Sequence, residues 1–170
     1  GMATGYYDDD RTSPTYGQTF NQGTIENHGT IEVTNPNTIG MYAVGAGSKA
    51  VNYGNINLLG SETVGMYIDR GAVGENWGTI QTAASGLTKV KGVYVANGGY
   101  IKNYGTINIV GNKNIGVYAF RGDVTDPNYV PYEAHGTGNT STRPYVEGTA
   151  TDQKVTGKAI VKVPPASLPS

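Results

Sequence analysis

The sequence predicts an all-β fold, a parallel β-helix (solenoid) with coils of about 24–27 residues, and two observations predict it. The first is a sequence segment that recurs four times in similar form: NHGTIEVTNPNTIGMY (27–42), NYGNINLLGSETVGMY (52–67), NWGTIQTAASGLTKVKGVY (76–94) and NYGTINIVGNKNIGVY (103–118). Self-similarity at a fixed period of roughly 20–50 residues is typical of solenoids. The second is alternation of apolar and polar residues in period two, while glycine or β-branched residues interrupt every helical pattern between residues 23 and 124.

Two marks set the period. An asparagine opens each unit, at separations of 25, 24 and 27 residues: Asn27, Asn52, Asn76 and Asn103. A Gly-x-Tyr follows, beginning at Gly40, Gly65, Gly92 and Gly116. The gap between the marks is 13 residues in three units and 16 in the third. The surplus lies in the polar stretch QTAASGLTK (81–89), which we expect to bulge as a loop from one corner.

Each unit contains two short alternating runs, Ile31-Glu32-Val33 and Met41-Tyr42-Ala43 in the first unit. Such alternation predicts strands with one buried face, and two or three of them describe one coil. Successive coils stack at about 4.8 Å, so equivalent residues should form columns. The expected internal columns are Ile31, Ile56, Ile80 and Ile107; Val33, Leu58, Thr82 and Ile109; and Met41, Met66, Val93 and Val117.

The repeated asparagines and glycines have structural roles in this interpretation. The four asparagines that open the units are expected to form a ladder of side-chain amides at a turn. Two residues after each asparagine stands a glycine, which should occupy a corner that needs positive φ or a close approach of backbones: Gly29, Gly54, Gly78 and Gly105.

Two aromatic columns are the candidate ligand-binding residues. If Met41 and Ala43 point inward, period two sends the intervening tyrosine outward, which gives the column Tyr42, Tyr67, Tyr94 and Tyr118. A second column should face outward or line a corner: His28, Tyr53, Trp77 and Tyr104. Stacked rings can present an amphipathic platform to sugars or to an apolar protein surface. The alternative is that each column packs on itself and only strengthens the sheet.

The ends of the chain differ from the repeats at 21–124. Residues 1–20 show no pattern and are expected to be a flexible lead-in or cap, with Gly1-Met2 resembling a tag scar. Residues 125–170 begin as a proline- and glycine-rich loop, regain alternation at 155–163 and finish as a tail. They could cap the open end of the β-helix, whose strand edges must be covered.

Composition and motifs argue against several functions. The net charge is -1 and charged residues make up 15% of the chain, which shows no footprint for nucleic acid. There is no cysteine and no apolar run near the length of a membrane span. No catalytic motif, metal site or cofactor site is expected; the acidic run at 8–10 is interpreted as a solvated tail, and Asp69-Arg70 and Arg121-Gly122-Asp123 as charged corners.

The repeat also resembles a known family. The pattern N-x-G-T-I-x-V followed by x-I-G-M-Y-A, over residues 21–124, looks like the passenger repeats of large fusobacterial-type autotransporter (type V secretion) adhesins. This resemblance implies a right-handed parallel β-helix at the surface of a Gram-negative bacterium, held by an outer-membrane anchor. It also implies a role in adhesion, with a host or bacterial cell-surface glycan or protein as partner.

The function expected from these observations is that of a non-enzymatic adhesin fragment that extends and presents a binding surface. A polysaccharide-processing enzyme on the same scaffold is one alternative, because the β-helix fold also carries such enzymes. A purely structural stalk or fibre segment is another.

Overall fold

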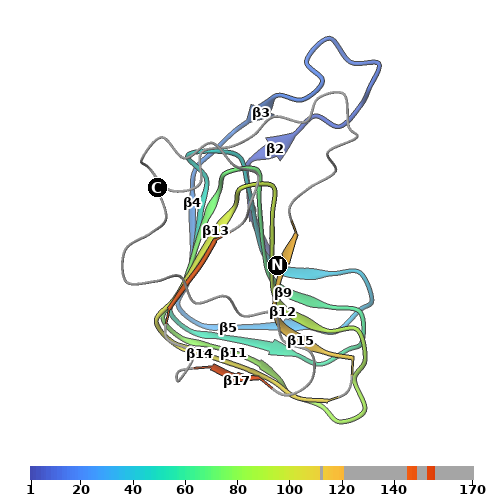
Figure 1. Ribbon diagram of the computed structural model, residues 1–170, viewed down its shortest axis with the longest axis vertical. Helices are drawn as coiled ribbons and strands as arrows, with labels where there is room; N and C mark the ends of the chain where they lie inside the picture. The colour runs from blue at the N-terminus through green and yellow to red at the C-terminus, as the bar shows by residue number, and fades with distance from the viewer. Residues whose placement is uncertain (112, 121–144, 149–152, 156–170) are drawn as a thin grey trace.

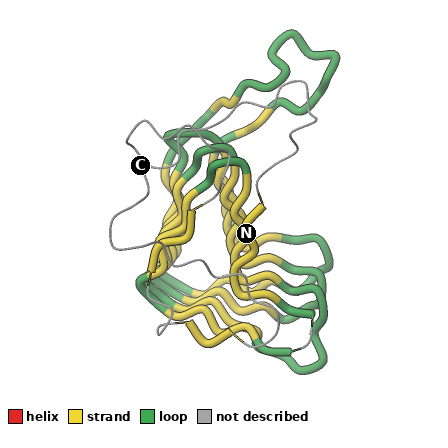
Figure 2. The backbone as a smooth tube through the Cα atoms, in the orientation of Figure 1, coloured by secondary structure: helices red, strands yellow, loops and turns green. Residues whose placement is uncertain are grey.

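The chain folds into a β-solenoid in the computed structural model, which describes residues 1–111, 113–120, 145–148 and 153–155. These residues contain no helix and form three parallel five-stranded sheets and one antiparallel two-stranded sheet. Figure 2 shows successive coils lying side by side, so that the three parallel sheets form the walls of a triangular interior. The predicted all-β solenoid is thereby confirmed, while its right-handed sense stays a prediction.

The three walls take their strands in strict rotation along the chain. The tyrosine sheet contains β1 (Met2–Thr4), β6 (Ile39–Val44), β9 (Val64–Asp69), β12 (Lys91–Ala96) and β15 (Ile115–Phe120). The asparagine sheet contains β4 (Thr24–Asn27), β7 (Lys49–Asn52), β10 (Val73–Asn76), β13 (Tyr100–Asn103) and β16 (Tyr145–Gly148). The isoleucine sheet contains β5 (Thr30–Val33), β8 (Asn55–Leu58), β11 (Thr79–Thr82), β14 (Thr106–Ile109) and β17 (Gln153–Val155).

The strand register confirms the predicted columns. Ile31, Ile56, Ile80 and Ile107 are partners across β5, β8, β11 and β14. Met41, Met66, Val93 and Val117 are partners in the tyrosine sheet. Most of these side chains are fully buried and belong to one core, which Ile31 joins as a partly buried member at its edge. The asparagine sheet is the wall that the alternating runs did not reveal, because only its last residue belongs to the repeated line.

The glycine two residues after each asparagine allows backbones to meet, but it needs no positive φ. A Cβ on Gly78 would lie 2.0 Å from the carbonyl oxygen of Gly54, and one on Gly105 would lie 2.1 Å from that of Gly78. None of these glycines has a left-handed φ, so the close approach of backbones is the predicted alternative that holds, at all of them except Gly29. The two-residue turn between the asparagine and isoleucine sheets is tight because each coil rests directly on the turn of the coil before it.

The Gly-x-Tyr glycines have a role that the sequence did not reveal. A Cβ on Gly40 would lie 2.7 Å from the Gly65 carbonyl oxygen and 3.1 Å from Cγ2 of Ile56. Gly65 and Gly92 meet the next coil and the isoleucine column in the same way. Glycine therefore leaves room for a branched side chain that enters from a different wall.

The connections from the isoleucine sheet to the tyrosine sheet carry the surplus residues of the third unit. The third connection, 83–90, has eight residues, whereas 34–38, 59–63 and 110–114 have five each. The prediction of a loop at one corner is confirmed, although the loop starts after β11. The next-to-last residue of each connection is a non-glycine residue with left-handed φ: Asn37, Glu62, Lys89 and Lys113.

The first coil carries a hairpin in place of a short corner. Strand β1 pairs in register with β6, and residues 5–23 then leave the stack as β2 (Tyr6–Tyr7) and β3 (Thr19–Phe20), which project from the coils in Figure 1. Asp8 is buried and accepts hydrogen bonds from Ser13 Oγ (2.5 Å) and Thr15 Oγ1 (2.6 Å). These bonds lower the pKa of the Asp8 carboxyl. The interpretation of 8–10 as a solvated tail is therefore wrong for Asp8, which ties the hairpin loop together.

The C-terminal region continues two of the walls. β16 pairs in parallel with β13, and β17 pairs in parallel with β14. The predicted alternation at 156–163 and the corner at Arg121-Gly122-Asp123 lie outside the described residues. Gly148 is the register partner of Asn103, so the asparagine column ends at this coil.

Candidate functional site

The tyrosine column lies on the outer face of the tyrosine sheet, as predicted. Tyr42, Tyr67, Tyr94 and Tyr118 are register partners, and successive ring centroids are 5.2, 4.6 and 5.2 Å apart. All four side chains are half-buried. Burial raises the pKa of Tyr42 and of Tyr94 to about 12, and it raises the pKa of Tyr67 as well. The column thus shields its hydroxyl groups from water more than a freely exposed platform would.

The corner column lies at the turn between the asparagine and isoleucine sheets and is more exposed. Tyr53, Trp77 and Tyr104 are 47%, 50% and 44% exposed. The rings form two stacked pairs, His28 with Tyr53 at 4.8 Å and Trp77 with Tyr104 at 4.3 Å between centroids. The two sets of candidate residues therefore form two separate surfaces and not one site.

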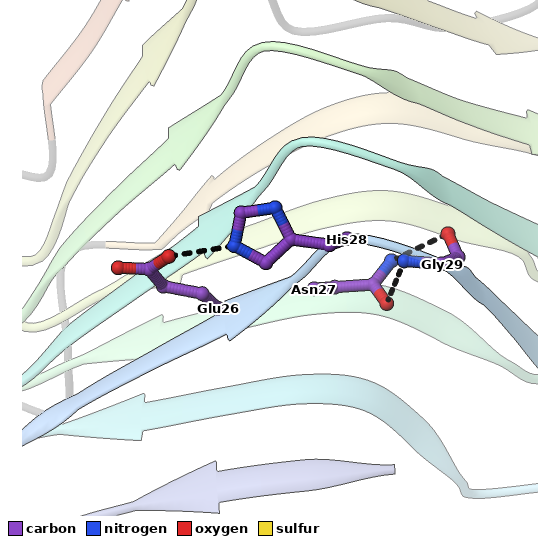
Figure 3. A network of polar contacts seen from close by, with 4 residues as sticks. All are labelled: Glu26, Asn27, His28 and Gly29. Carbon is purple, nitrogen blue, oxygen red and sulfur yellow. Dashed lines mark hydrogen bonds and ion pairs between the residues drawn. The ribbon is translucent and has the colours of Figure 1, made fainter.

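Charged side chains of the asparagine sheet orient the corner rings. His28 Nε2 lies 2.7 Å from Glu26 Oε2, and Trp77 Nε1 donates to Glu75 Oε1 at 2.9 Å. Glu75 also forms an ion pair with Lys49 Nζ at 2.5 Å. Figure 3 shows the first of these corners, where His28 reaches back to Glu26 while the neighbouring Asn27 amide bonds to the backbone of Gly29. His28 and Trp77 are thus each held at the ring edge by a glutamate, and each stacks on the tyrosine of the next coil.

A groove beside the tyrosine column is a feature that sequence reasoning missed. It has a volume of about 490 Å³ and is lined by Asn37, Thr38, Ile39, Glu62, Val64, Tyr67, Lys89 and Lys91. Lys89 Nζ lies 3.9 Å from Glu62 Oε1, and both side chains are well exposed. Lys91 Nζ lies 5.7 Å from the centre of the Tyr118 ring. The groove thus combines an aromatic and aliphatic floor with two ammonium groups and one carboxylate.

A buried ion pair stands at the opposite end of the tyrosine strands. Asp69 is 2% exposed, pairs with Arg70, and accepts a hydrogen bond of 2.7 Å from Asn97 Nδ2. Burial raises the pKa of the Asp69 carboxyl, and the Arg70 guanidinium opposes that shift. Arg70 also lies over the ring of Tyr7, 3.6 Å from its centre. Asp69-Arg70 stands at the corner where β9 ends, as predicted, but Asp69 is buried there and the pair fastens the hairpin to the stack.

Neither a metal-binding cluster nor a membrane-spanning helix is present in the described part of the chain. Residues 1–111, 113–120, 145–148 and 153–155 contain no group of three or more His, Cys, Asp or Glu side chains placed to hold a metal ion. No helix in the same part of the chain is long and apolar enough to cross a membrane.

Comparison with known proteins gives one partial likeness. Residues 1–77 match the family described as the BigA third pectate lyase-like domain. The matched segment begins before β1, includes the projecting hairpin and ends one residue after β10. No curated protein and no solved structure shows a significant match to the chain.

Proposed function

We propose that this chain is a segment of a bacterial surface passenger that binds a cell-surface glycan or protein and does so without catalysis. The observation that carries the proposal is the set of aromatic side chains that the stacking holds in register on the outside of the solenoid. Aromatic rings that combine apolar area with a polar edge are enriched where proteins contact partners.

The match to the BigA third pectate lyase-like domain supports a surface passenger, and with it a location at the cell surface or outside the cell. The repeat pattern supports the finer version, a passenger of the fusobacterial autotransporter type. The described coils also suit presentation, because each one contacts only its neighbours and a stack of them extends in one dimension.

Binding is favoured over polysaccharide cleavage by the contents of the groove. Glycoside hydrolysis generally uses two carboxylates on either side of the scissile bond. Glu62 is the one carboxylate among the residues that line the groove, and it faces Lys89. The groove therefore offers cationic groups that can bind an anion, but it lacks the second carboxylate that an acid–base pair for hydrolysis needs.

The experiment is a glycan and host-protein binding array on the purified chain, with two matched variants. The corner variant Tyr53→Ser/Trp77→Ser/Tyr104→Ser removes exposed rings, and the tyrosine variant Tyr42→Phe/Tyr67→Phe/Tyr94→Phe keeps the rings but removes hydroxyl groups. Circular dichroism and urea unfolding confirm that each variant folds.

Saturable binding that the corner variant loses assigns contact to the corner column, and binding that the tyrosine variant loses assigns it to the tyrosine column. Absence of binding by the wild-type chain to every glycan and protein would contradict the proposal and favour a spacer. Turnover of a polysaccharide, followed by the release of reducing ends, would favour the enzyme instead.

A further inference from the structure

The third coil departs from the others at one position of the tyrosine sheet and in the length of the connection before it. In the register of the tyrosine sheet, the position before each Gly-x-Tyr is occupied by Ile39, Val64 and Ile115 in three coils but by Lys91 in the third. The connection that precedes Lys91 is also the longest of the four, and Lys89 is its residue with left-handed φ. Lys89 and Lys91 both line the same groove.

Lys91 replaces an aliphatic side chain and has no carboxylate partner among the described residues. The aliphatic side chains that replace it in other coils cover the outer face with apolar area. Among the described residues, no carboxylate lies within 4.0 Å of Lys91 Nζ, and its polar neighbour is the ring of Tyr118. Lys89 is held only by a long, exposed contact with Glu62. Two cations therefore stand beside the groove with little charge to neutralise them.

The rest of the groove fits a ring with one apolar face. Ile39, Val64 and Tyr67 supply aliphatic and aromatic area, while Asn37 and Thr38 supply polar groups at the rim. Its volume of about 490 Å³ is within the range of roughly 300–1,000 Å³ in which proteins bind small ligands. An anion on such a ring would reach the two ammonium groups.

We propose that this groove binds an acidic saccharide, a pyranose that carries a carboxylate or a sulfate. The apolar face of the sugar lies on Tyr67 and Val64, and the anionic group lies between Lys89 and Lys91. The inference rests on the proposed function, because it names the chemical class of the glycan and the residues that select it.

The repeat itself supplies substitutions that remove the charges without new strain. Lys91→Ile introduces the residue of the first and fourth coils, and Lys89→Asn introduces the residue that has the same left-handed φ in the first coil. Asparagine tolerates that conformation. Lys102→Gln, on the asparagine sheet, removes one charge from a different wall and serves as control.

The test is calorimetric titration of the whole chain with sialyllactose, a heparin-derived hexasaccharide, neutral lactose and a poly-glutamate peptide. We expect sialyllactose or the heparin fragment to bind at least about tenfold more tightly than lactose, and added salt to weaken that binding. The double variant should lose about tenfold or more in affinity for the acidic probe, while Lys102→Gln should match the wild type. The two acidic probes show whether carboxylate or sulfate is recognised.

Three results would overturn the inference: no binding of either acidic saccharide, equal binding by the double variant, or binding of poly-glutamate alone. Wild-type binding to neutral glycans or to proteins on the array, combined with any of these, would leave the proposed function standing. Failure of the whole array would remove the proposed function itself.

Discussion

Asn76 and Trp77 are neighbours in the chain, yet Asn76 is fully buried and Trp77 is half exposed. The same contrast recurs in every coil. Asn27, Asn52 and Asn76 each donate from Nδ2 to Oδ1 of the next asparagine over 2.8 to 2.9 Å, so the ladder runs from Asn27 to Asn103. The exposed position beside it holds His28, Tyr53, Trp77 and Tyr104.

The difference shows which constraint acts at each column. A buried amide that both donates and accepts along an axis must be matched by another of the same length, because an unpaired polar group in the interior is costly. Ring stacking asks only for a flat side chain at about the right distance, so the identity of the ring can change. At this turn, the identical residues support the interior and the variable rings form the exposed surface.

The largest expected effect comes from the turn that separates the two columns. Gly78→Ala should lower the free energy of unfolding by at least about 3 kcal/mol, because its Cβ would lie 2.0 Å from the Gly54 carbonyl oxygen and coils would have to separate. Gly29→Ala is the matched control at the same repeat position, and a Cβ there has no atom within 4 Å. Urea unfolding of both variants is the measurement. Similar losses in the two would contradict close coil contact as the reason for the glycine.

The asparagine ladder should give the next largest effect. Asn52→Ala removes the acceptor of Asn27 and the donor to Asn76, so we expect a loss of about 2–3 kcal/mol in the free energy of unfolding. Asn103 is the internal control. Its Oδ1 accepts from Asn76, but its buried Nδ2 has no partner among the described residues, so Asn103→Ala should cost only about 1 kcal/mol. Equal costs in denaturant titration would mean that cavity formation, and not the ladder, determines the effect.

The tyrosine column is intermediate in exposure between the buried asparagines and the exposed corner rings. Burial raises the pKa of Tyr42 and Tyr94 to about 12, so the folded chain keeps protons that the unfolded chain loses near pH 10. The free energy of unfolding should therefore fall as pH rises from about 10 to about 12, by about 1–2 kcal/mol between pH 9 and pH 11 after allowance for partial exposure.

The matched variant for this pH effect is Tyr42→Phe/Tyr94→Phe, which keeps both rings and removes both titrating groups. Urea unfolding at the two pH values should show a smaller decrease for the variant than for the wild type. An equal decrease would assign the alkaline loss of stability to groups other than Tyr42 and Tyr94, Tyr67 among them.

The fold could be predicted because stacking converts a linear period into columns. Once Asn27 and Asn52 are taken as equivalent, Ile31 with Ile56 and Tyr42 with Tyr67 follow at fixed offsets. The ladder and both aromatic columns required no further information. β1 was missed because Met2–Thr4 pairs with β6 from a segment that lacks the repeated residues.

The groove and the Gly40 contact depend on neighbours from different walls and coils. The space at Gly40 is filled by Ile56, from the isoleucine sheet of the next coil, and no sequence period places those two residues together. Lys91 could have drawn attention as a charged residue at the position that Ile39, Val64 and Ile115 occupy in the other coils. The strand register places it on the same wall as Tyr67, but the groove between the side chains of successive coils required the structure.

The smallest effect on stability is expected at the corner column, where the size of the effect separates a structural role from a binding role. Trp77→Ser removes a ring that stacks on Tyr104 and bonds to Glu75 but does not contribute to the core, so the free energy of unfolding should fall by no more than about 1 kcal/mol. Paired measurement of unfolding and of binding on the array then separates support from recognition. If the corner column contacts a partner, Trp77→Ser should lose affinity while the fold is retained. If the column is only structural, Trp77→Ser should lose stability to the extent expected for Asn52→Ala. Because Asn76 and Trp77 share one turn, a large loss of stability in Trp77→Ser would show that the exposed rings hold the coils together and would remove the reason for assigning them to a partner.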